Sequence, residues 1–258
     1  MFTQKSKRDS ESAPEPEAPL RRGPGRPPGR TAQGAHSQEQ LYETAIGLIA
    51  DKGYEATTLR DIARKANVSV GLLYRYFPSK RAVVLALYDR LSAEHARRAL
   101  EMPQGKWRNR FLFALRTSLQ VLGPHRSTLA ALVPVLVGDP GEGLFAENTA
   151  FSRLRVQSAF SEAVAGARDA PGPQVSAALG RLLYLVQLTV ILWWLLDKSP
   201  RQRATEGLIA LIERVLPAFA VALRLRPTRA GIVVADALLR DALLPDVSDE
   251  TREGAVDR

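Results

Sequence analysis

The sequence contains no cysteine and only three histidines. The lack of cysteine excludes disulfides, thiolate catalysis and zinc sites built from thiolates. The histidines, His36, His95 and His125, lie far apart in the sequence, and no G-x-S-x-G, phosphate-loop or HExxH pattern is present. We interpret all three as surface residues, and we expect no enzymatic activity, no metal site and no cofactor.

Long apolar runs are also missing. The most apolar window, LLYLVQLTVILWWLL, has 15 residues (182–196) and includes Gln187 and Thr189, whereas a membrane-spanning helix needs about 20. The first twenty residues, MFTQKSKRDSESAPEPEAPL, lack the apolar centre of an export signal. We therefore expect a buried helix at 182–196, no membrane partner and a cytoplasmic location.

Charge is unevenly distributed along the chain. The net charge is +9, and residues 18–81 alone hold 11 Lys and Arg against 5 Asp and Glu. A charge that served only solubility would be spread evenly. A basic unit at one end instead indicates a polyanionic partner.

Alternating strand patterns and Asn-Gly or Asp-Gly hairpin signals are absent, while helical periodicity dominates from Ser37 onward. The sequence therefore predicts an all-α protein. Ser37 and Gln40 form a capping box that opens the first helix, and Gly53 supplies the left-handed residue that ends it. Ser199 and Gln202 form a second capping box. Later helices are predicted near 104–122, 125–137, 144–168, 173–197, 200–225 and 229–243, with kinks at Pro134 and Pro217.

The segment TTLRDIARKANVSVGLLYRYFPSK, residues 57–80, is the most informative. A helix opens near Thr58, and Asn67 ends it because asparagine tolerates the left-handed conformation. Ser69 caps a short helix that ends at Phe77, and Ser79 caps a long one. Two short helices joined so tightly must cross steeply, which predicts a helix-turn-helix whose second helix can enter a DNA major groove.

The stretch 37–100, which contains this segment, resembles the N-terminal domain of the TetR/AcrR family of bacterial transcription regulators. The resemblance is carried by Thr57-Thr58, Asp61-Ile62-Ala63, Val68-Ser69, Leu73-Tyr74-Arg75-Tyr76-Phe77 and Ser79-Lys80. It implies a three-helix DNA-binding domain followed by a helical domain that binds a ligand and dimerises. We expect four parts: a basic Pro/Gly/Arg-rich arm, disordered in isolation (1–36), the helix-turn-helix domain (37–82), the regulatory domain (83–225), and a helix with a flexible tail (226–258).

The resemblance also implies residue roles. The positions that face DNA are Val70, Gly71, Leu72, Tyr74 and Tyr76, with Arg75 as a further candidate, and the phosphate contacts are Thr58 and Lys80. Tyr74 and Tyr76 are two residues apart and cannot share one core stripe, so at least one is exposed. Either tyrosine could instead pack on the core, and Leu72 could pack beneath its helix. Val70 and Leu72 can contact only thymine methyl groups, so this helix has few side chains that can hydrogen-bond to base edges.

The stretch RRGPGRPPGR, residues 21–30, precedes this domain. Gly25-Arg26-Pro27 resembles the core of an AT-hook, and the arm is long enough to reach a neighbouring minor groove. Arg26 is therefore a candidate for minor-groove contact. The alternative, a solvated basic tail that adds nonspecific phosphate affinity, stays open.

The regulatory domain is expected to bind a small apolar effector that releases a repressor from DNA. Its polar ligand-binding candidates are Gln120, Gln157 and Gln187. Helices at 173–197 and 200–225 are apolar on several faces, which indicates a homodimer and hence a near-palindromic operator on double-stranded DNA. Two other hypotheses stay open: an enzyme, and a protein that compacts DNA without sequence preference.

Overall fold

The computed structural model describes residues 32–139, 141 and 143–243, and all regular elements in these ranges are helices. They are α1 (Ala32–Lys52), α2 (Leu59–Lys65), α3 (Val70–Tyr76), α4 (Lys80–Ala99), α5 (Trp107–Leu122), α6 (Arg126–Ala131), α7 (Val133–Gly138), α8 (Ala150–Ala165), α9 (Pro173–Leu196), α10 (Arg203–Ala222) and α11 (Arg226–Leu243), with single turns η1 (Gly123–His125), η2 (Glu147–Thr149) and η3 (Pro200–Gln202). The all-α prediction is confirmed. Arg26, most of the predicted arm and the predicted tail from 244 onward lie outside the described residues.

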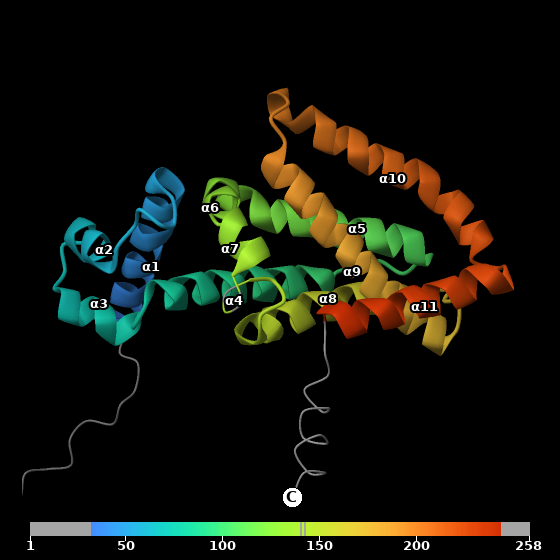
Figure 1. Ribbon diagram of the computed structural model, residues 1–258, viewed down its shortest axis with the longest axis horizontal. Coiled ribbons are helices and arrows are strands. Elements are labelled where there is room, and N and C mark those ends of the chain that lie inside the picture. The colour runs from blue at the N-terminus through green and yellow to red at the C-terminus, as the bar shows by residue number, and fades with distance from the viewer. Residues whose placement is uncertain (1–31, 140, 142, 244–258) are drawn as a thin grey trace, which may run out of the picture.

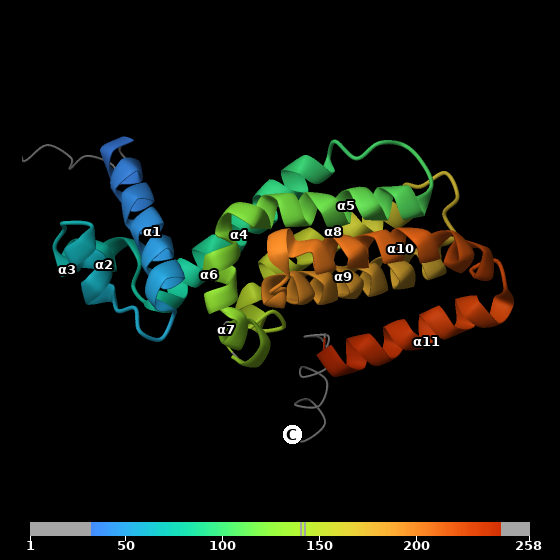
Figure 2. The ribbon, with the colours of Figure 1, turned by 90° about the horizontal axis from the view of Figure 1, so that it is seen from above.

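The helices form a small N-terminal unit and a larger bundle (Figure 1). α1, α2 and α3 make up the small unit, and α4 runs from it along the bundle. α10 and α11 flank the bundle on opposite sides in this view, and the view from above shows α9 and α10 running side by side (Figure 2). One core cluster joins α1–α4 to α5–α7 and the end of α9, and a second lies between α5, α8, α9, α10 and α11.

Most predicted helix ends around the small unit are confirmed. Gly53 has φ 86° and Asn67 has φ 55°, so both supply the left-handed turn that was expected. The side-chain oxygens of Thr58, Ser69 and Ser79 each accept a hydrogen bond of 3.1 Å from a backbone N–H in the first turn of α2, α3 and α4. Each cap satisfies a donor that has no helical partner.

The predicted start of α1 is wrong. The helix begins at Ala32, so Ser37 lies inside it and does not cap it. The segment AQGAH before Ser37 contains two alanines and a glutamine, which favour helix, and no proline. The helix therefore continues toward the N-terminus at little cost.

The predicted capping box at Ser199 is also wrong. Arg201 and Gln202 have φ of 55° and 58°, so the helix starts only at Arg203. The Gln202 side chain instead accepts a hydrogen bond from Trp194 Nε1 at 2.7 Å. Asp197 caps α10, because its carboxylate accepts hydrogen bonds from the Thr205 backbone N–H at 2.9 Å and the Thr205 hydroxyl at 2.6 Å.

Proline has different effects in two later helices. Pro134 lies in the first turn of α7 and separates it from α6, where a single kinked helix was expected. Pro217 lies inside α10, which continues through it. The predicted helix from 144 begins later, at Ala150, after η2.

α9 is buried on one side only. It is the helix among the described residues that could cross a membrane by length and composition, and 44% of its most apolar window is buried in the protein. Val190 and Trp194 are buried, whereas Trp193 is 49% exposed. The expectation of a buried helix thus holds for the face that packs on α5, α8 and α11.

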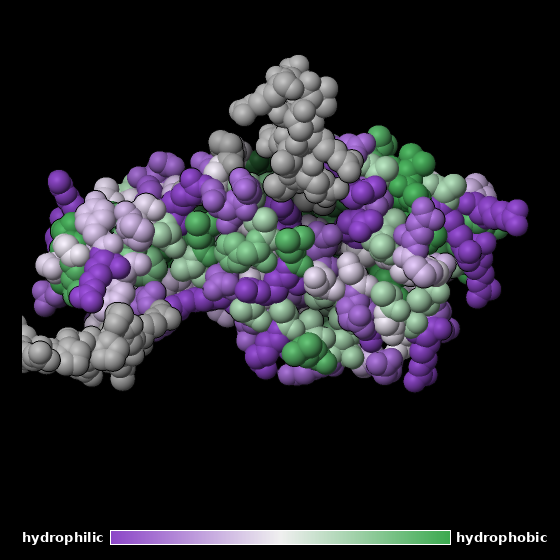
Figure 3. Space-filling model, turned by 90° about the horizontal axis from the view of Figure 1, so that it is seen from below, coloured by the Kyte–Doolittle hydropathy of each residue, from purple (hydrophilic) through white to green (hydrophobic). Residues whose placement is uncertain are grey.

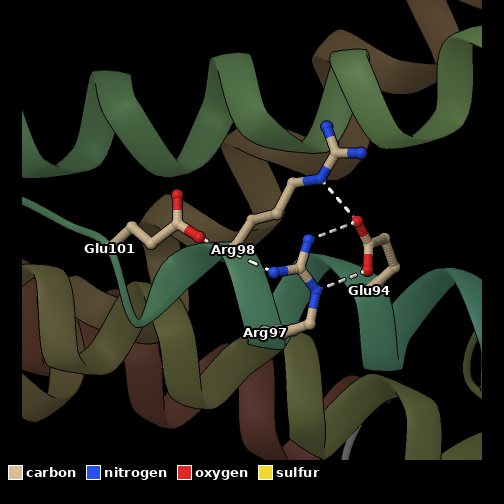
Figure 4. Close-up of polar contacts among 4 residues, drawn as sticks. All are labelled: Glu94, Arg97, Arg98 and Glu101. Atoms are coloured by element: carbon tan, nitrogen blue, oxygen red, sulfur yellow. Dashed lines mark hydrogen bonds and ion pairs between the residues drawn. The ribbon is translucent and has the colours of Figure 1, made fainter.

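An ion-pair cluster stabilises the C-terminal end of α4 (Figure 4). Glu94 accepts hydrogen bonds from Arg97 Nε at 2.8 Å and from Arg98 Nε at 2.6 Å, and Glu101 lies 3.6 Å from Arg97. These contacts lower the pKa of Glu94 to about 2. The arginines also lie in the last turn, where the helix macrodipole favours cations. We call Glu94, Arg97, Arg98 and Glu101 the α4 ion-pair cluster.

Candidate nucleic-acid interface and ligand cavity

α2 and α3 pack through a small set of buried side chains. Ile62 and Ala63 of α2 are almost fully buried, as are Leu73 of α3 and Phe77 after it. The backbone N–H of Val68 donates to the Ala63 carbonyl at 3.0 Å and closes the turn between the helices. The predicted helix-turn-helix is therefore present, with Leu73 and Phe77 as structural residues.

The opposite face of α3 is open to solvent. Tyr74 is 50% exposed and Val70 is 37% exposed. Gly71 and Arg75 are exposed as well, and a Cβ added at Gly71 would meet no atom within 4 Å. Four of the predicted α3 positions thus form one accessible surface, which we call the α3 outer face.

Leu72 and Tyr76 are half-buried at the border of the α3 outer face. Tyr76 packs against the core cluster of the small unit, as the alternative interpretation allowed. Its neighbour two residues earlier, Tyr74, is exposed. The prediction that at least one of the two tyrosines is exposed is therefore confirmed, because they do not share one side of the helix.

Thr58 directly precedes α2 and Lys80 is the first residue of α4, and both make contacts within the protein. The Thr58 hydroxyl donates to the Asp61 carboxylate at 2.7 Å, which also lowers the pKa of Asp61. Lys80 Nζ donates to the Tyr54 carbonyl at 2.6 Å and lies 4.1 Å from the centre of the Tyr54 ring. An ammonium has three donors, so this bond leaves Lys80 capacity for a phosphate.

Sequence reasoning missed the contacts that hold α1 in place. The buried Thr57 hydroxyl donates to the Gly53 carbonyl at 2.7 Å and so locks the turn between α1 and α2. Arg90 of α4 forms two bonds to Glu39 of α1, at 2.6 and 2.7 Å, and lies 3.7 Å from the centre of the Tyr42 ring. The partners lie 51 residues apart, so no local pattern reveals them.

A largely apolar cavity of about 410 Å³ lies inside the bundle. Side chains of α4, α5, α6, α7, α8 and α9 line it, together with Leu243 at the end of α11. Its volume is in the range of pockets that bind small molecules. The bundle therefore encloses a cavity large enough for a small molecule.

The three glutamines predicted to bind ligand occupy different places. Gln187 is 3% exposed and lines the cavity. Gln120 is exposed and lines a separate, smaller pocket beside Tyr42 and Arg90. Gln157 is half-buried on α8 and is not among the residues that line the cavity.

The interpretation of His95 as a surface residue is wrong. His95 is 3% exposed and lines the cavity. With Tyr88, Leu91 and Ser92 it follows helical spacing on the inner face of α4, and this stripe is the signal that could have revealed it. The other two histidines have no such burial, since His36 is exposed and His125 is half-exposed.

The fold and the α3 outer face define a two-part, all-α helix-turn-helix protein. Residues 41–87 match the family model described as bacterial regulatory proteins, tetR family. The helix-turn-helix segment of this chain is thus similar to that of the tetR family.

Curated relatives match only part of this chain. The transcriptional repressor KstR of Mycolicibacterium smegmatis is 39% identical over 67 residues, which cover 24% of this chain and 33% of KstR. The uncharacterized regulator YuxN of Bacillus subtilis is 42% identical over 52 residues, which cover 20% of this chain and 18% of YuxN. The chain thus matches a third or less of the length of these two relatives.

Solved structures match the whole architecture. A tetR-family regulator from Streptomyces coelicolor superposes with a TM-score of 0.54 at 21% identity, covering 86% of this chain and 98% of the other. A TetR/AcrR-family regulator from Aquifex aeolicus gives a TM-score of 0.52 at 17% identity, covering 71% of this chain and 99% of the other. At these identities the similarity establishes the fold.

Proposed function

We propose that this protein is a dimeric, sequence-specific DNA-binding repressor that a small molecule releases from its operator. The observation that carries the proposal is the α3 outer face, a solvent-exposed surface on the second helix of a helix-turn-helix. Such a helix fits a major groove about 12 Å wide. The repressor name of the relative KstR supports the direction of regulation.

The DNA contacts divide by chemistry. Tyr74, Arg75 and Tyr76 carry hydrogen-bonding groups that can read base edges, whereas Val70 and Leu72 offer apolar contact to thymine methyl groups. Gly71 allows close approach, and Thr58 and Lys80 are the proposed phosphate contacts. Arg26, outside the described residues, is the candidate for minor-groove contact.

The homodimer interface is proposed on α9 and α10. Large apolar side chains are exposed on both helices, with Leu196 59%, Leu211 56% and Val215 53% exposed. On the face seen from below, away from α10, apolar residues are scattered among hydrophilic ones (Figure 3). Two helices from each subunit would bury these side chains in a four-helix bundle and would place two α3 helices on a near-palindromic operator.

Two structural links connect the cavity to the small unit. α4 carries Lys80 at one end and His95, in the cavity wall, further along. On the other side, Arg126 of α6 donates to the carbonyls of Trp194 and Asp197 at the end of α9, at 2.9 and 2.8 Å, and Thr128 contacts the Ile46 carbonyl of α1 at 3.4 Å. A ligand that binds one arrangement of α4 and α9 better can therefore shift the spacing of the two α3 helices.

Sequencing the genomic DNA that the purified protein retains tests the proposal. We expect enrichment of a few near-palindromic sites, and protection of such a site in a footprint at physiological salt. Binding that is no tighter to these sites than to random DNA would indicate a DNA-compacting protein and overturn the proposal. We propose regulation rather than catalysis as the activity, and the cytoplasm as the location.

A further inference from the structure

The cavity wall contains a buried hydrogen-bond acceptor on His95. His95 Nε2 lies 3.2 Å from the Ala114 carbonyl. A carbonyl can only accept, so Nε2 carries the proton, and burial lowers the pKa of the ring and keeps it neutral. Nδ1 is therefore an acceptor, and it is buried without a partner in the part of the chain that the structure describes.

Gln187 adds a second acceptor close to the first. Its Nε2 donates to Ser118 Oγ at 3.4 Å, and its Oε1 is buried with no partner among the described residues. Ala114 and Ser118, which hold His95 and Gln187, are one turn apart on α5. The two acceptors therefore approach the same stretch of cavity wall from α4 and α9.

Arg153 of α8 supplies a cation to the same wall. Its Nη1 reaches only the carbonyls of Leu144 and Ala146, both at 3.3 Å, and its Nε is buried without a partner. None of the described carboxylates lies within ion-pair distance of it, although other arginines of the bundle have such partners. Its charge acts on the buried Tyr184 hydroxyl, opposing the burial that raises the pKa of that group.

Leaving His95 Nδ1, Gln187 Oε1 and Arg153 Nε without partners is unfavourable in free energy. A buried polar atom without a partner is unfavourable in free energy, and so is a cation without an accompanying anion, here the half-buried Arg153 with its buried Nε. The remaining lining is mostly leucine, isoleucine and valine. An occupant with an anionic group, a hydrogen-bond donor and an apolar body would pair with Arg153, satisfy one of the two acceptors and fill the remaining space.

We propose that the cavity binds an apolar carboxylic acid that also carries a hydroxyl group. The carboxylate pairs with Arg153, the hydroxyl donates to Gln187 Oε1 or His95 Nδ1, and the hydrocarbon fills the rest of the cavity. This assignment rests on the proposed function only in taking the cavity as the effector site.

Compounds with one hydrocarbon body and different polar groups test the head-group assignment. The probes are dodecanoate, dodecanol, dodecylammonium and hydroxydodecanoates with the hydroxyl at different carbons, and binding to the full-length protein is measured by native mass spectrometry and calorimetry without DNA. We expect dodecanoate to bind about tenfold or more tighter than dodecanol, and at least one hydroxydodecanoate to bind tighter still. Equal affinity for dodecanoate, dodecanol and dodecylammonium would overturn the proposal.

Variants assign the contacts. Arg153→Gln should weaken dodecanoate about tenfold or more while leaving dodecanol within about twofold, and Arg153→Lys should restore part of the loss. One of the two variants Gln187→Met and His95→Phe, the one that removes the acceptor used by the hydroxyl, should remove the preference for the hydroxylated probe but not that for the carboxylate. The control is Arg116→Gln, an exposed arginine on α5 that pairs with Glu213. A loss of dodecanol binding in Arg153→Gln equal to that of dodecanoate would mean a structural role and would contradict the assignment.

The failure of the proposed function is distinguishable from the failure of this inference. Binding is read without DNA, and operator release is read separately by fluorescence anisotropy. Carboxylates that bind through Arg153 but leave the operator occupied support the ligand class and contradict the effector role. If only neutral probes release the operator, the effector role of the cavity is supported and the carboxylic-acid ligand class is contradicted.

Discussion

The ion pair between Arg181 of α9 and Asp236 of α11 gives the most specific stability prediction. The guanidinium donates to the carboxylate twice, at 2.5 and 2.6 Å. The Asp236 side chain is 5% exposed and that of Arg181 is 25% exposed. Asp236→Leu removes the carboxylate and leaves the partly buried guanidinium without this partner.

The expected magnitude follows from burial. Breaking a buried ion pair costs about 3–5 kcal/mol because one charge stays without compensation. A quarter of Arg181 remains in water, so we expect Asp236→Leu to lower the free energy of unfolding by roughly 2–3 kcal/mol. The double variant Arg181→Met with Asp236→Leu replaces both charges by apolar groups and should recover most of this loss.

Urea unfolding followed by circular dichroism measures these free energies, and hydrogen exchange in α11 shows where the protein loosens. The matched control is Arg240→Gln, because Arg240 lies 3.6 Å from the same carboxylate on the exposed side of α11, and it should change stability by less than about 1 kcal/mol. A double variant as unstable as Asp236→Leu alone would refute the reasoning, since the uncompensated charge would then not be the cause.

Four further predictions follow from other residues. Burial lowers the pKa of His95 below its ordinary value of 6.5, so the unfolded chain takes up the proton at a higher pH than the folded protein does. The contribution of neutral His95 to the free energy of unfolding should be fully present above about pH 6.5 and should decrease as the pH falls below that value. The urea midpoint of His95→Gln should lack this pH dependence. The pKa of Glu94 is lowered from 4.5 to about 2, so the contribution of the α4 ion-pair cluster should be present above pH 4.5 and lost between pH 4.5 and about 2; an acid titration of Glu94→Gln identical to that of the unaltered protein would contradict this. Tyr74→Ala should weaken operator binding about tenfold in anisotropy titrations without lowering the urea midpoint, because the side chain is half exposed; a lowered midpoint would instead indicate a packing role. Arg26→Ala should weaken binding to operators flanked by A·T tracts more than to those flanked by G·C pairs, and an equal loss on both would leave the arm as nonspecific charge.

The helix-turn-helix was predictable from the sequence because its determinants are local. Thr58, Ser69 and Ser79 each bond to a backbone N–H three residues away, so a short window contains both partners. Gly53 and Asn67 act through their own φ angles. Such features do not depend on the rest of the chain, and the predicted ends of these helices are confirmed.

The incorrect predictions share a different physical origin. At Ser199 the capping pattern was present, but the Gln202 side chain bonds to Trp194 and does not complete the box. Asp197 and Ser199 Oγ, which accepts from the Ala204 N–H at 2.9 Å, together cap α10, because the end of α9 lies beside the start of α10. Gln202 could bond either within its own turn or to the end of α9, and the packing of α9 beside α10 favours the second partner. A capping pattern is therefore a weaker signal where two long helices meet.

The sequence by itself determined the helices, the helix-turn-helix and the surplus of basic charge near it, since periodicity, capping and composition depend on neighbouring residues. Only the tertiary structure decided the cavity. His95, Arg153 and Gln187 come from α4, α8 and α9, and each looks like an ordinary polar residue within its own helix. Their shared burial and their missing partners exist only once these helices pack around one space, and that packing turns three ordinary residues into a candidate ligand site.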